Sequence, residues 1–127
     1  MTVAKDIMIT DIITVTKKTK LGKVIHLLVQ NRITGLPVID EVNQLIGMVT
    51  EKDVLEVLYS GKIKGKTVEN IMSTGIVAFN ENDDLMSIIK CLFDNHFRRV
   101  PITSGSILKG IITRRDIIKF LSSKMSE

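Results

Sequence analysis

The hydrophobic positions of this chain follow one order twice. A short apolar run opens each half, at residues 12–15 and 76–79, and predicts a buried strand. Apolar residues then recur at the i, i+3, i+4, i+7 spacing of one helical face, namely Leu21, Val24, Ile25 and Leu28 in the first half and Leu85, Ile88, Ile89 and Leu92 in the second. Thr19 and Asp83 stand where the N-caps of these two helices are expected.

Two further strands and a second helix complete each predicted unit. The strands are expected at 36–39 and 45–49 in the first half, and at 100–102 and 108–112 in the second. Polar turns at 40–44 and 103–106 make each pair of strands a hairpin. The closing helices carry Val54, Leu55, Val57 and Leu58, and Ile117, Ile118, Phe120 and Leu121. The predicted class is therefore α+β, with the order βαββα present twice.

The two halves also match residue by residue. Ile7-Met8 and Pro37 are repeated 64 positions later, and Gly47, Thr50 and Asp53 are repeated 63 positions later. We infer one domain over residues 1–127 that holds a first motif at 3–60, a basic linker at 61–67 and a second motif at 68–121. Because a small sheet with helices on one face needs cover on the other, we expect the motifs to pack sheet to sheet about a pseudo-twofold axis, with paired clefts between them.

Composition narrows the class of protein without deciding its function. The chain has 127 residues, of which 44% are hydrophobic and 25% charged, as in one soluble globular domain. Its single cysteine, Cys91, and the lack of a signal segment favour the cytoplasm. No apolar run approaches the roughly 18 residues that a membrane span needs. The net charge of +4 attracts phosphates of any kind, which leaves nucleotides, nucleic acids and membrane surfaces as partners to distinguish.

A Thr-x-x-Asp element stands at the start of each closing helix. Thr50 and Asp53 follow Gly47 in the first half, and Thr113 and Asp116 follow Gly110 in the second. A helix start stabilises an anion such as phosphate, and a carboxylate beside it can accept hydrogen bonds from a ribose diol. Basic residues occupy the same turns: Lys52, Arg114 and Arg115. The alternative is a capping box that serves only the helix, which is the commoner role for one isolated element.

These motifs together resemble the CBS (cystathionine β-synthase) domain family. The resemblance covers about residues 3 to 121 and rests on Leu36-Pro37-Val38-Ile39-Asp40 with the Thr50 element, and on Arg99-Val100-Pro101-Ile102 with the Thr113 element. It implies a tandem pair, a Bateman module, that binds adenosine nucleotides. Asp53 or Asp116 would hold the ribose, and Thr50 or Thr113 would contact phosphate or ribose. Adenine would lie against the first strand and the proline strand, at Ile13, Thr14, Val15, Val77, Ala78, Pro37 and Pro101.

A basic pair precedes the second proline. Arg98 and Arg99 resemble the pair found in the γ subunits of AMP-activated kinases, and they would be phosphate ligands because arginine can bond phosphate oxygens in a bidentate way. The alternative is two solvated surface arginines. Thr34 and Gly35 stand at the matching positions of the first motif, so we expect one stronger and one weaker site.

Other chemistry is not supported by the sequence. The linker at 61–67 resembles a phosphate loop, but its glycines are too close together and a helix precedes it. His26, His96 and Cys91 are too few and too irregularly spaced for a zinc site. No pair of carboxylates suits acid and base catalysis, so we expect no enzyme, no catalytic residue and no cofactor, with Mg²⁺ entering only on a bound nucleotide.

The leading hypothesis is a regulatory module that senses AMP, ADP, ATP or S-adenosylmethionine. It would act on a partner protein or through self-association. The resemblance to the family implies a homodimer with the helices at 51–59 and 114–121 on its faces. A nucleic-acid-binding module is the first alternative, disfavoured by an aromatic content of 4% and by the lack of a basic helical stripe. A purely structural dimerisation module and a nucleotidase are the others.

Overall fold

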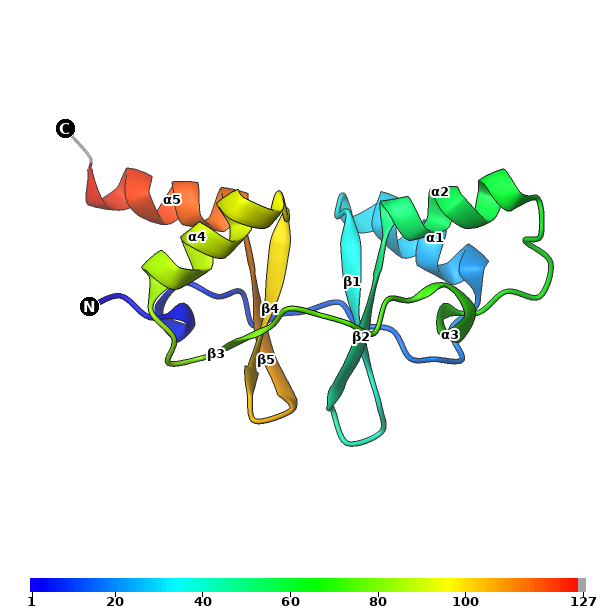
Figure 1. Cartoon of the computed structure of the whole chain (residues 1–127), viewed down its shortest axis with the longest axis horizontal. Coiled ribbons are helices and arrows are strands. Elements are labelled where there is room, and N and C mark those ends of the chain that lie inside the picture. Colours follow the sequence, from blue (N-terminus) through cyan, green and yellow to red (C-terminus); the bar gives the residue numbers. More distant parts are fainter. Residues whose placement is uncertain (126–127) are drawn as a thin grey trace. The chain divides into compact units, whose positions relative to one another are not determined.

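Residues 1–12 pack with the second half of the chain rather than with the first. The computed structural model of the protein describes residues 1–125 (Figure 1). It divides into two compact units, which we call unit 1 and unit 2. Unit 1 joins residues 1–12 to the chain from Val77 onward, and unit 2 is the continuous stretch Ile13–Ile76. The sequence therefore supplies unit 2 in one piece and unit 1 in two.

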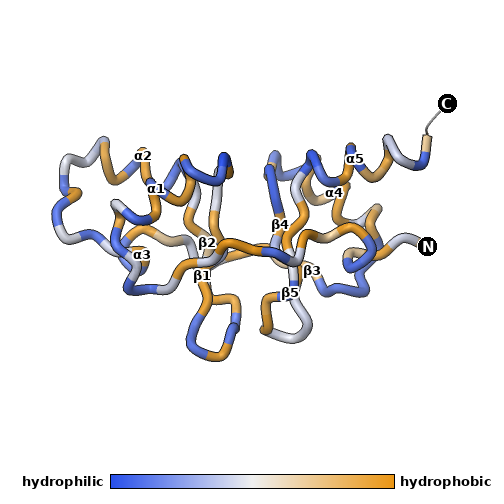
Figure 2. Tube along the Cα trace, turned by 180° about the vertical axis from the view of Figure 1, so that it is seen from behind, coloured by the Kyte–Doolittle hydropathy of each residue, from blue (hydrophilic) through white to orange (hydrophobic). Residues whose placement is uncertain are grey.

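Unit 2 consists of a hairpin and three helices. Its elements are α1 (Leu21–Asn31), β1 (Gly35–Ile39), β2 (Leu45–Thr50), α2 (Glu51–Ser60) and α3 (Val68–Ile71). The two strands are antiparallel and pair Gly35 with Thr50 at the open end of the hairpin. Asp40 shapes the hydrophilic turn between them, since its Oδ1 accepts from the backbone N–H groups of Val42 at 3.0 Å and Gln44 at 2.8 Å (Figure 2).

Unit 1 repeats this plan with one strand more. Its elements are η1 (Ala4–Asp6), β3 (Phe79–Asn80), α4 (Leu85–Asn95), β4 (Arg99–Ser104), β5 (Ile107–Thr113) and α5 (Arg114–Lys124). The sheet has the order β3-β4-β5, in which β3 is parallel to β4 and β5 is antiparallel to it. Both predicted hairpins and all four long helices are thus present, and the mixed class predicted from the sequence is confirmed.

Each unit has its own hydrophobic core. The predicted helical faces are buried in them: Leu21, Val24 and Leu28 of α1 in one, and Leu85, Ile88 and Leu92 of α4 in the other. Strand residues Leu36, Val38 and Val49 complete the first core, and Val100, Ile102 and Ile112 complete the second. The i, i+3, i+4, i+7 spacing identified the residues that each helix buries.

The first strand of each motif is shorter than predicted. At 12–15 only Val15 forms a bridge, in parallel with Val38, and at 76–79 only Phe79 belongs to a strand. Val77 and Ala78 are exposed, so the prediction of a buried strand at 76–79 was wrong. An apolar run alone does not show how many of its backbone groups will find partners.

The helices α1 and α4 begin one residue later than predicted. Their N-caps are Lys20 and Asp84 rather than Thr19 and Asp83. The backbone carbonyl of Thr19 instead accepts from the N–H of Val68, which opens the short helix α3. Asp84 does cap its helix, since its side chain accepts from the N–H of Met86, whereas Lys20 has no side-chain cap bond.

The segment that carries the Ile-Met run of each motif pairs with a strand of the other motif. Ile9, next to the first run, forms a two-way backbone pair with Ile111 of β5, with N to O distances of 2.9 and 3.0 Å. Ser73, next to the second run, forms the matching pair with Met48 of β2, at 2.8 and 3.0 Å. The start of each motif therefore adds to the hairpin of the other, which is why unit 1 needs residues 1–12.

Candidate functional site

The Thr-x-x-Asp element of unit 2 is a complete capping box at the start of α2. The backbone N–H of Asp53 donates to Thr50 Oγ1 at 3.3 Å, and the backbone N–H of Thr50 donates to Asp53 Oδ2 at 2.8 Å. Thr50 Oγ1 also donates to the same Oδ2, at 3.0 Å. Both residues are half-buried. The box fixes the position of the Asp53 carboxylate at the junction of β2 and α2.

Unit 1 repeats this geometry at the start of α5. The N–H of Thr113 donates to Asp116 Oδ2 at 2.8 Å, and the N–H of Asp116 donates to Thr113 Oγ1 at 3.1 Å. Thr113 and Asp116 are half-buried as well. The duplicated sequence thus places two carboxylates in equivalent positions, one in each unit.

The capping bonds occupy one oxygen of each carboxylate. Within each unit, the capping bonds of Asp53 and Asp116 end on Oδ2. An ionised carboxylate can accept about four hydrogen bonds, so each carboxylate has acceptor capacity beyond its cap. The adjacent helix start provides positive potential for an anionic group.

A third box shows what the motif does when it serves only a helix. Thr67 caps α3, and its N–H donates to Asn70 Oδ1 at 3.0 Å. This helix has four residues and its cap carries an amide rather than a carboxylate. An amide oxygen therefore satisfies the capping geometry, which means that capping alone does not require the charge of Asp53 or Asp116.

In unit 2 the predicted adenine-contact residues lie in one small region. The N–H of Val15 donates to the carbonyl of Pro37 at 3.1 Å, and the N–H of Ile39 donates to the carbonyl of Val15 at 2.9 Å. Ile13 and Thr14 precede this bridge and are partly exposed. Because the proline lies in β1, whose other end pairs with Thr50, unit 2 brings these residues to the same sheet as its Thr-x-x-Asp element.

Unit 1 arranges the equivalent residues in the same way. Pro101 lies in β4 and pairs with Ile111, and Arg99 at the start of that strand pairs with Thr113. Val77, which is 42% exposed, and Ala78 lie immediately before β3, the strand that runs beside β4. The exposed run was predicted to be buried, yet its exposure leaves it accessible to a ligand.

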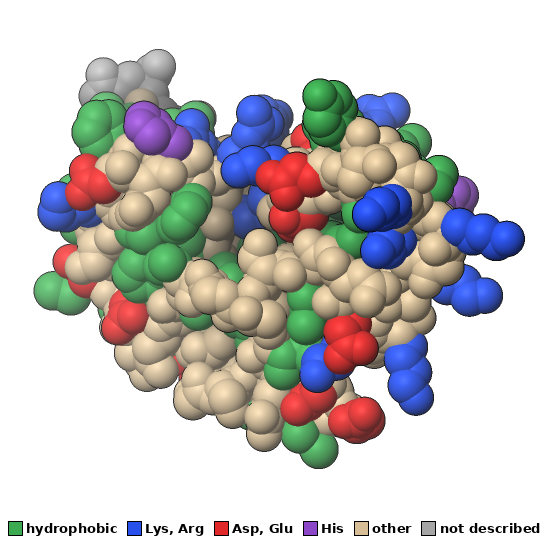
Figure 3. Space-filling model, turned by 45° about the vertical axis from the view of Figure 1, so that its right-hand side comes forward, with side chains coloured by type: hydrophobic (Ala, Val, Ile, Leu, Met, Phe, Trp, Pro, Cys, Tyr) green, Lys and Arg blue, Asp and Glu red, His purple; other side chains and the backbone are tan. Residues whose placement is uncertain are grey.

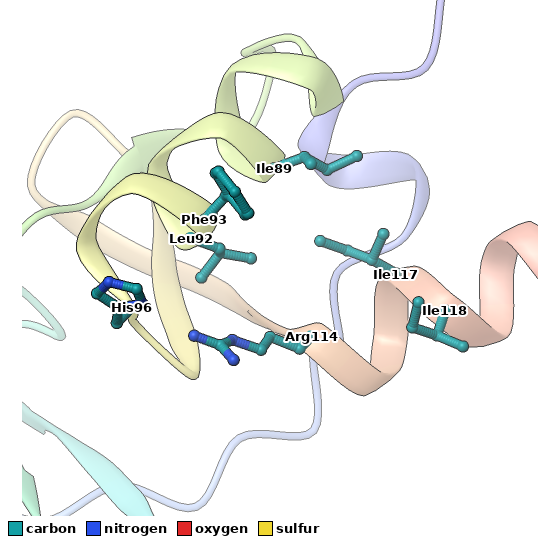
Figure 4. A pocket seen from close by; sticks show the side chains of 7 residues that line it. All are labelled: Ile89, Leu92, Phe93, His96, Arg114, Ile117 and Ile118. Carbon is teal, nitrogen blue, oxygen red and sulfur yellow. The ribbon is translucent and has the colours of Figure 1, made fainter.

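The basic residues predicted to bind phosphate make different contacts in the two units. Arg98 is exposed, and its carbonyl accepts from the N–H of Arg114 at 3.1 Å. The Arg114 Nε donates to the carbonyl of Phe97 at 2.6 Å, so this side chain turns to the end of α4, beside His96 (Figure 4). Sequence reasoning did not find that bond. Arg115 is exposed, and Lys52 reaches Glu56 at 3.9 Å on the surface of α2.

At the position of the basic pair, unit 2 has a threonine and a buried glycine. The carbonyl of Thr34 accepts from the N–H of Glu51 at 3.0 Å, which is the same backbone bond that Arg98 makes in unit 1. The backbone of the two units therefore matches here while the side-chain charge does not.

Neither a metal cluster nor a membrane helix is found in the described residues. Across residues 1–125, no three His, Cys, Asp or Glu side chains are grouped so that they could hold a metal ion. In the same stretch, no helix combines the length and the apolar character needed to cross a membrane.

The fold and its two duplicated boxes define a tandem pair of motifs, and comparison with known proteins identifies the family. The model of the CBS domain matches residues 4–60 and again residues 68–123. The chain therefore belongs to the CBS domain family, as the resemblance in its motifs predicted.

Relatives with this domain differ in size. The chain is 29% identical over 118 residues to the CBS domain-containing protein YhcV of Bacillus subtilis, covering 92% of this chain and 84% of that protein. It is 28% identical to the protein MJ1225 of Methanocaldococcus jannaschii, of which it spans 42%, and 32% identical to inosine-5'-monophosphate dehydrogenase of the same organism, of which it spans 23%. In these last two proteins the similarity covers 94% and 91% of this chain, so the match is to the CBS pair within longer chains.

Solved structures of CBS pairs superpose over nearly the whole chain. The crystal structure of CBSX2 in complex with AMP has a TM-score of 0.90 at 26% identity, with 98% of each chain covered. The CBS domain pair of MJ0100 in complex with 5-methylthioadenosine and S-adenosyl-L-methionine has a TM-score of 0.86 at 26% identity, again with 98% of each chain covered.

Proposed function

We propose that this chain is a regulatory module that binds an adenosine-containing ligand and passes its occupancy to a partner protein or through a homodimer. The ligand class is AMP, ADP, ATP or S-adenosylmethionine. The chain itself would carry out no catalysis, and Mg²⁺ would enter only as part of a bound nucleotide.

One observation carries the proposal. Each unit holds a half-buried aspartate whose Oδ2 is fixed by a capping box, and a carboxylate can accept more bonds than the cap uses. The fixed carboxylate suits a ribose, whose two neighbouring hydroxyls are hydrogen-bond donors. The helix start at Thr50 or Thr113 would favour a phosphate or another anionic group. The box of α3 has an amide in place of the carboxylate, so a box of this kind can form without the charge.

The surroundings of each aspartate support an adenosine ligand. In each unit the proline strand leads to the Thr-x-x-Asp element, and a partly exposed run with apolar side chains lies beside that strand. We propose that adenine lies against this run and the proline strand. We propose phosphate contacts for Arg98, Arg99, Arg114 and Arg115 in unit 1 and for Lys52 in unit 2; Arg114 would have to leave the Phe97 carbonyl to make its contact.

The relatives support the same class of ligand. CBSX2 was crystallised with AMP, and the MJ0100 pair with 5-methylthioadenosine and S-adenosyl-L-methionine. These ligands share the adenosine group. The proposed contacts are made to the adenosine group. They therefore indicate the class of ligand and do not single out one member of that class.

Calorimetric titration tests the proposal. Purified protein is titrated with AMP, ADP, ATP and S-adenosylmethionine, together with the double variant Asp53→Asn/Asp116→Asn. We expect saturable binding of at least one ligand to the wild type and a loss of at least tenfold in affinity in the variant, because an amide cannot match a carboxylate as acceptor for a diol. The asparagine variant should retain its caps, as Asn70 does on α3.

The matched control is Asn70→Ala, which removes a cap outside the proposed site. It should leave ligand affinity unchanged. If folded wild-type protein binds none of the four ligands, both Thr-x-x-Asp elements are helix caps only, and a structural dimerisation module becomes the better account. Product formation from ATP or AMP with Mg²⁺ would contradict the absence of catalysis.

A further inference from the structure

The basic linker at 61–67 is bonded to the start of α1 through its backbone. The N–H of Leu21 donates to the carbonyl of Lys66 at 3.0 Å. Directly after the linker, the N–H of Val68 donates to the carbonyl of Thr19 at 2.8 Å. The sequence predicted this segment only as a linker, and these bonds give its end a fixed place in unit 2.

A groove lies between this linker, the start of α1 and the end of α2. It has a volume of about 580 Å³. Its apolar lining consists of Leu21 and Ile25 of α1, Leu58 of α2 and Ile63 of the linker. Leu21 is 6% exposed and belongs to the core, whereas Leu58 and Ile63 are each 45% exposed. The groove therefore offers apolar surface that is partly open to solvent.

The charged side chains that line this groove are all lysines. They are Lys20, Lys64 and Lys66, and among the described residues of the lining none is acidic. No ion pair between described residues uses any of these three lysines. On the face that Figure 3 presents, several basic side chains stand on the right-hand side. The groove thus combines apolar contacts with a positive potential.

The repeated fold does not require this positive charge. At the spacing of 64, Lys20 corresponds to Asp84, and Lys17 corresponds to Glu81. Asp84 caps α4 with its side chain, whereas Lys20 stands at the N-cap of α1 without a side-chain cap bond. A cation is unfavourable at the positive end of a helix. The lysines of the groove therefore oppose local stability, and an acidic partner would relieve this repulsion.

We propose that this groove binds an acidic segment of a partner protein, which places large apolar side chains between the lysines. Its carboxylates would pair with Lys20, Lys64 and Lys66, and its apolar side chains would contact Leu58 and Ile63. All the lining residues belong to unit 2. The inference goes beyond the proposed function, because it needs neither an adenosine ligand nor a second copy of the chain.

The shape and lining of the groove favour a peptide over other anionic partners. A small ligand is usually buried over most of its surface, which the half-exposed Leu58 and Ile63 do not provide. Single-stranded nucleic acid stacks its bases on aromatic rings, and no described residue of the lining is aromatic. A membrane surface is contacted by apolar side chains that protrude, whereas these line a hollow. A peptide segment can place its side chains into such a groove.

Selection from a displayed library of random peptides tests the inference on the full chain. One bait is the wild type, and a second is Lys64→Glu/Lys66→Glu, which reverses two charges of the groove. We expect the peptides enriched on the wild type alone to combine acidic with large apolar side chains. The matched control bait is Lys5→Glu/Lys109→Glu, which makes the same change in net charge at exposed positions of unit 1 and should enrich the wild-type peptides. No enrichment on the wild type, or equal enrichment on the groove variant, would overturn the inference.

Nuclear magnetic resonance then locates a selected peptide on the isotope-labelled protein. We expect amide shifts at 20–25, 58 and 63–67, and the same spectra show whether each variant is folded. Ile63→Ser removes apolar surface without a change in charge and should weaken binding about fivefold or more. A peptide with lysines in place of its acidic residues should bind Lys64→Glu/Lys66→Glu more tightly than it binds the wild type. Shifts confined to unit 1 or to the Thr50 element would refute the site.

Two further measurements separate this inference from other accounts. Sedimentation with vesicles of phosphatidylcholine, with and without phosphatidylserine, tests a membrane as the occupant. Binding of the wild type to the anionic vesicles, together with a selection that enriches no peptide, would overturn the inference in favour of a membrane surface. In calorimetry, Lys64→Glu/Lys66→Glu should bind AMP or S-adenosylmethionine as the wild type does, so that a failure of ligand binding and a failure of peptide binding are observed separately.

Discussion

Met8 lies directly over Gly110, although the two residues are far apart in the chain. A β-carbon at position 110 would lie 2.6 Å from Sδ and 2.7 Å from Cγ of Met8. The duplicate contact is between Met72 and Gly47, where a β-carbon would lie 2.9 Å from Sδ and 3.0 Å from the carbonyl oxygen of Ser73. Each glycine thus makes room for the methionine of the other motif, and the exchanged segments depend on it.

Gly110→Ala should destabilise unit 1. The added methyl group overlaps three side-chain atoms of Met8, so the segment at 1–12 must shift, at a cost of about 1–3 kcal/mol in the free energy of unfolding. Urea unfolding followed by circular dichroism measures this change. The double variant Met8→Ala/Gly110→Ala should lose less than the sum of its single variants, because the overlap with Cγ and Sδ is gone.

Gly22→Ala is the matched control for that substitution. A β-carbon there meets no atom within 4 Å, and the residue lies in α1. We expect a stabilisation of roughly 0.5–1 kcal/mol, because alanine loses less conformational entropy than glycine in a helix. If Gly22→Ala and Gly110→Ala have the same effect, the contact with Met8 does not explain the glycine.

The capping boxes should contribute to stability as well as to ligand binding. Thr113→Ala removes the acceptor for the N–H of Asp116 and should lower the free energy of unfolding by about 1 kcal/mol. Thr113→Ser retains an oxygen at this place and should cost much less. Thermal unfolding of the three proteins without ligand measures the difference. Equal stability of the alanine variant and the wild type would show that the box contributes nothing to folding.

Two helices are followed by a residue in the left-handed conformation that is not a glycine. Arg32 after α1 has φ 54° and His96 after α4 has φ 56°. Since glycine adopts this conformation without steric cost, Arg32→Gly should raise the free energy of unfolding by about 0.5–1 kcal/mol. Arg32→Ala keeps the β-carbon and should change stability little. A stabilisation of the same size in both variants would indicate that the side chain, rather than the backbone, is responsible.

Ligand binding should stabilise the wild type in proportion to its occupancy. At a ligand concentration of 100 times the dissociation constant, the expected gain is about 2.7 kcal/mol for one site. Differential scanning calorimetry with AMP and with S-adenosylmethionine measures it as a rise in Tm. Asp53→Asn/Asp116→Asn should show little of this rise. An equal rise in the variant would place the bound ligand elsewhere on the chain.

The sequence predicted the parts of the fold that depend on local spacing. Leu21, Val24 and Leu28 are buried because they lie on one face of a helix, and this face follows from their separation alone. The extent of the first strands did not follow, because an apolar run such as the one at 76–79 does not show how many of its backbone groups find partners. In the run at 12–15, only Val15 forms a backbone bridge, with Val38.

The same distinction holds for the candidate site. The pairing of Thr50 with Asp53 within one capping box was predictable, since a box needs only four consecutive residues. The bond from Arg114 to the Phe97 carbonyl was not, because it joins residues 17 apart whose approach depends on the packing of α5 against the end of α4. The exchange of the Ile-Met runs was missed too, since we assigned each run to its own motif. The repetition of both methionine and glycine was the signal that pointed to it.

The exchange of these runs has a consequence for the order in which the protein folds during synthesis. Unit 2 is continuous and can fold once Ile76 has left the ribosome. Residues 1–12 emerge before unit 2, yet their partner strand β5 ends at Thr113, so they must wait until that strand has emerged as well. Bringing residues 1–12 to β5 closes a long loop, which costs conformational entropy. This cost is lower once unit 2 has folded, because most of the loop is then a compact body rather than a flexible chain. We therefore expect residues 1–12, although they are made before unit 2, to fold into place after it.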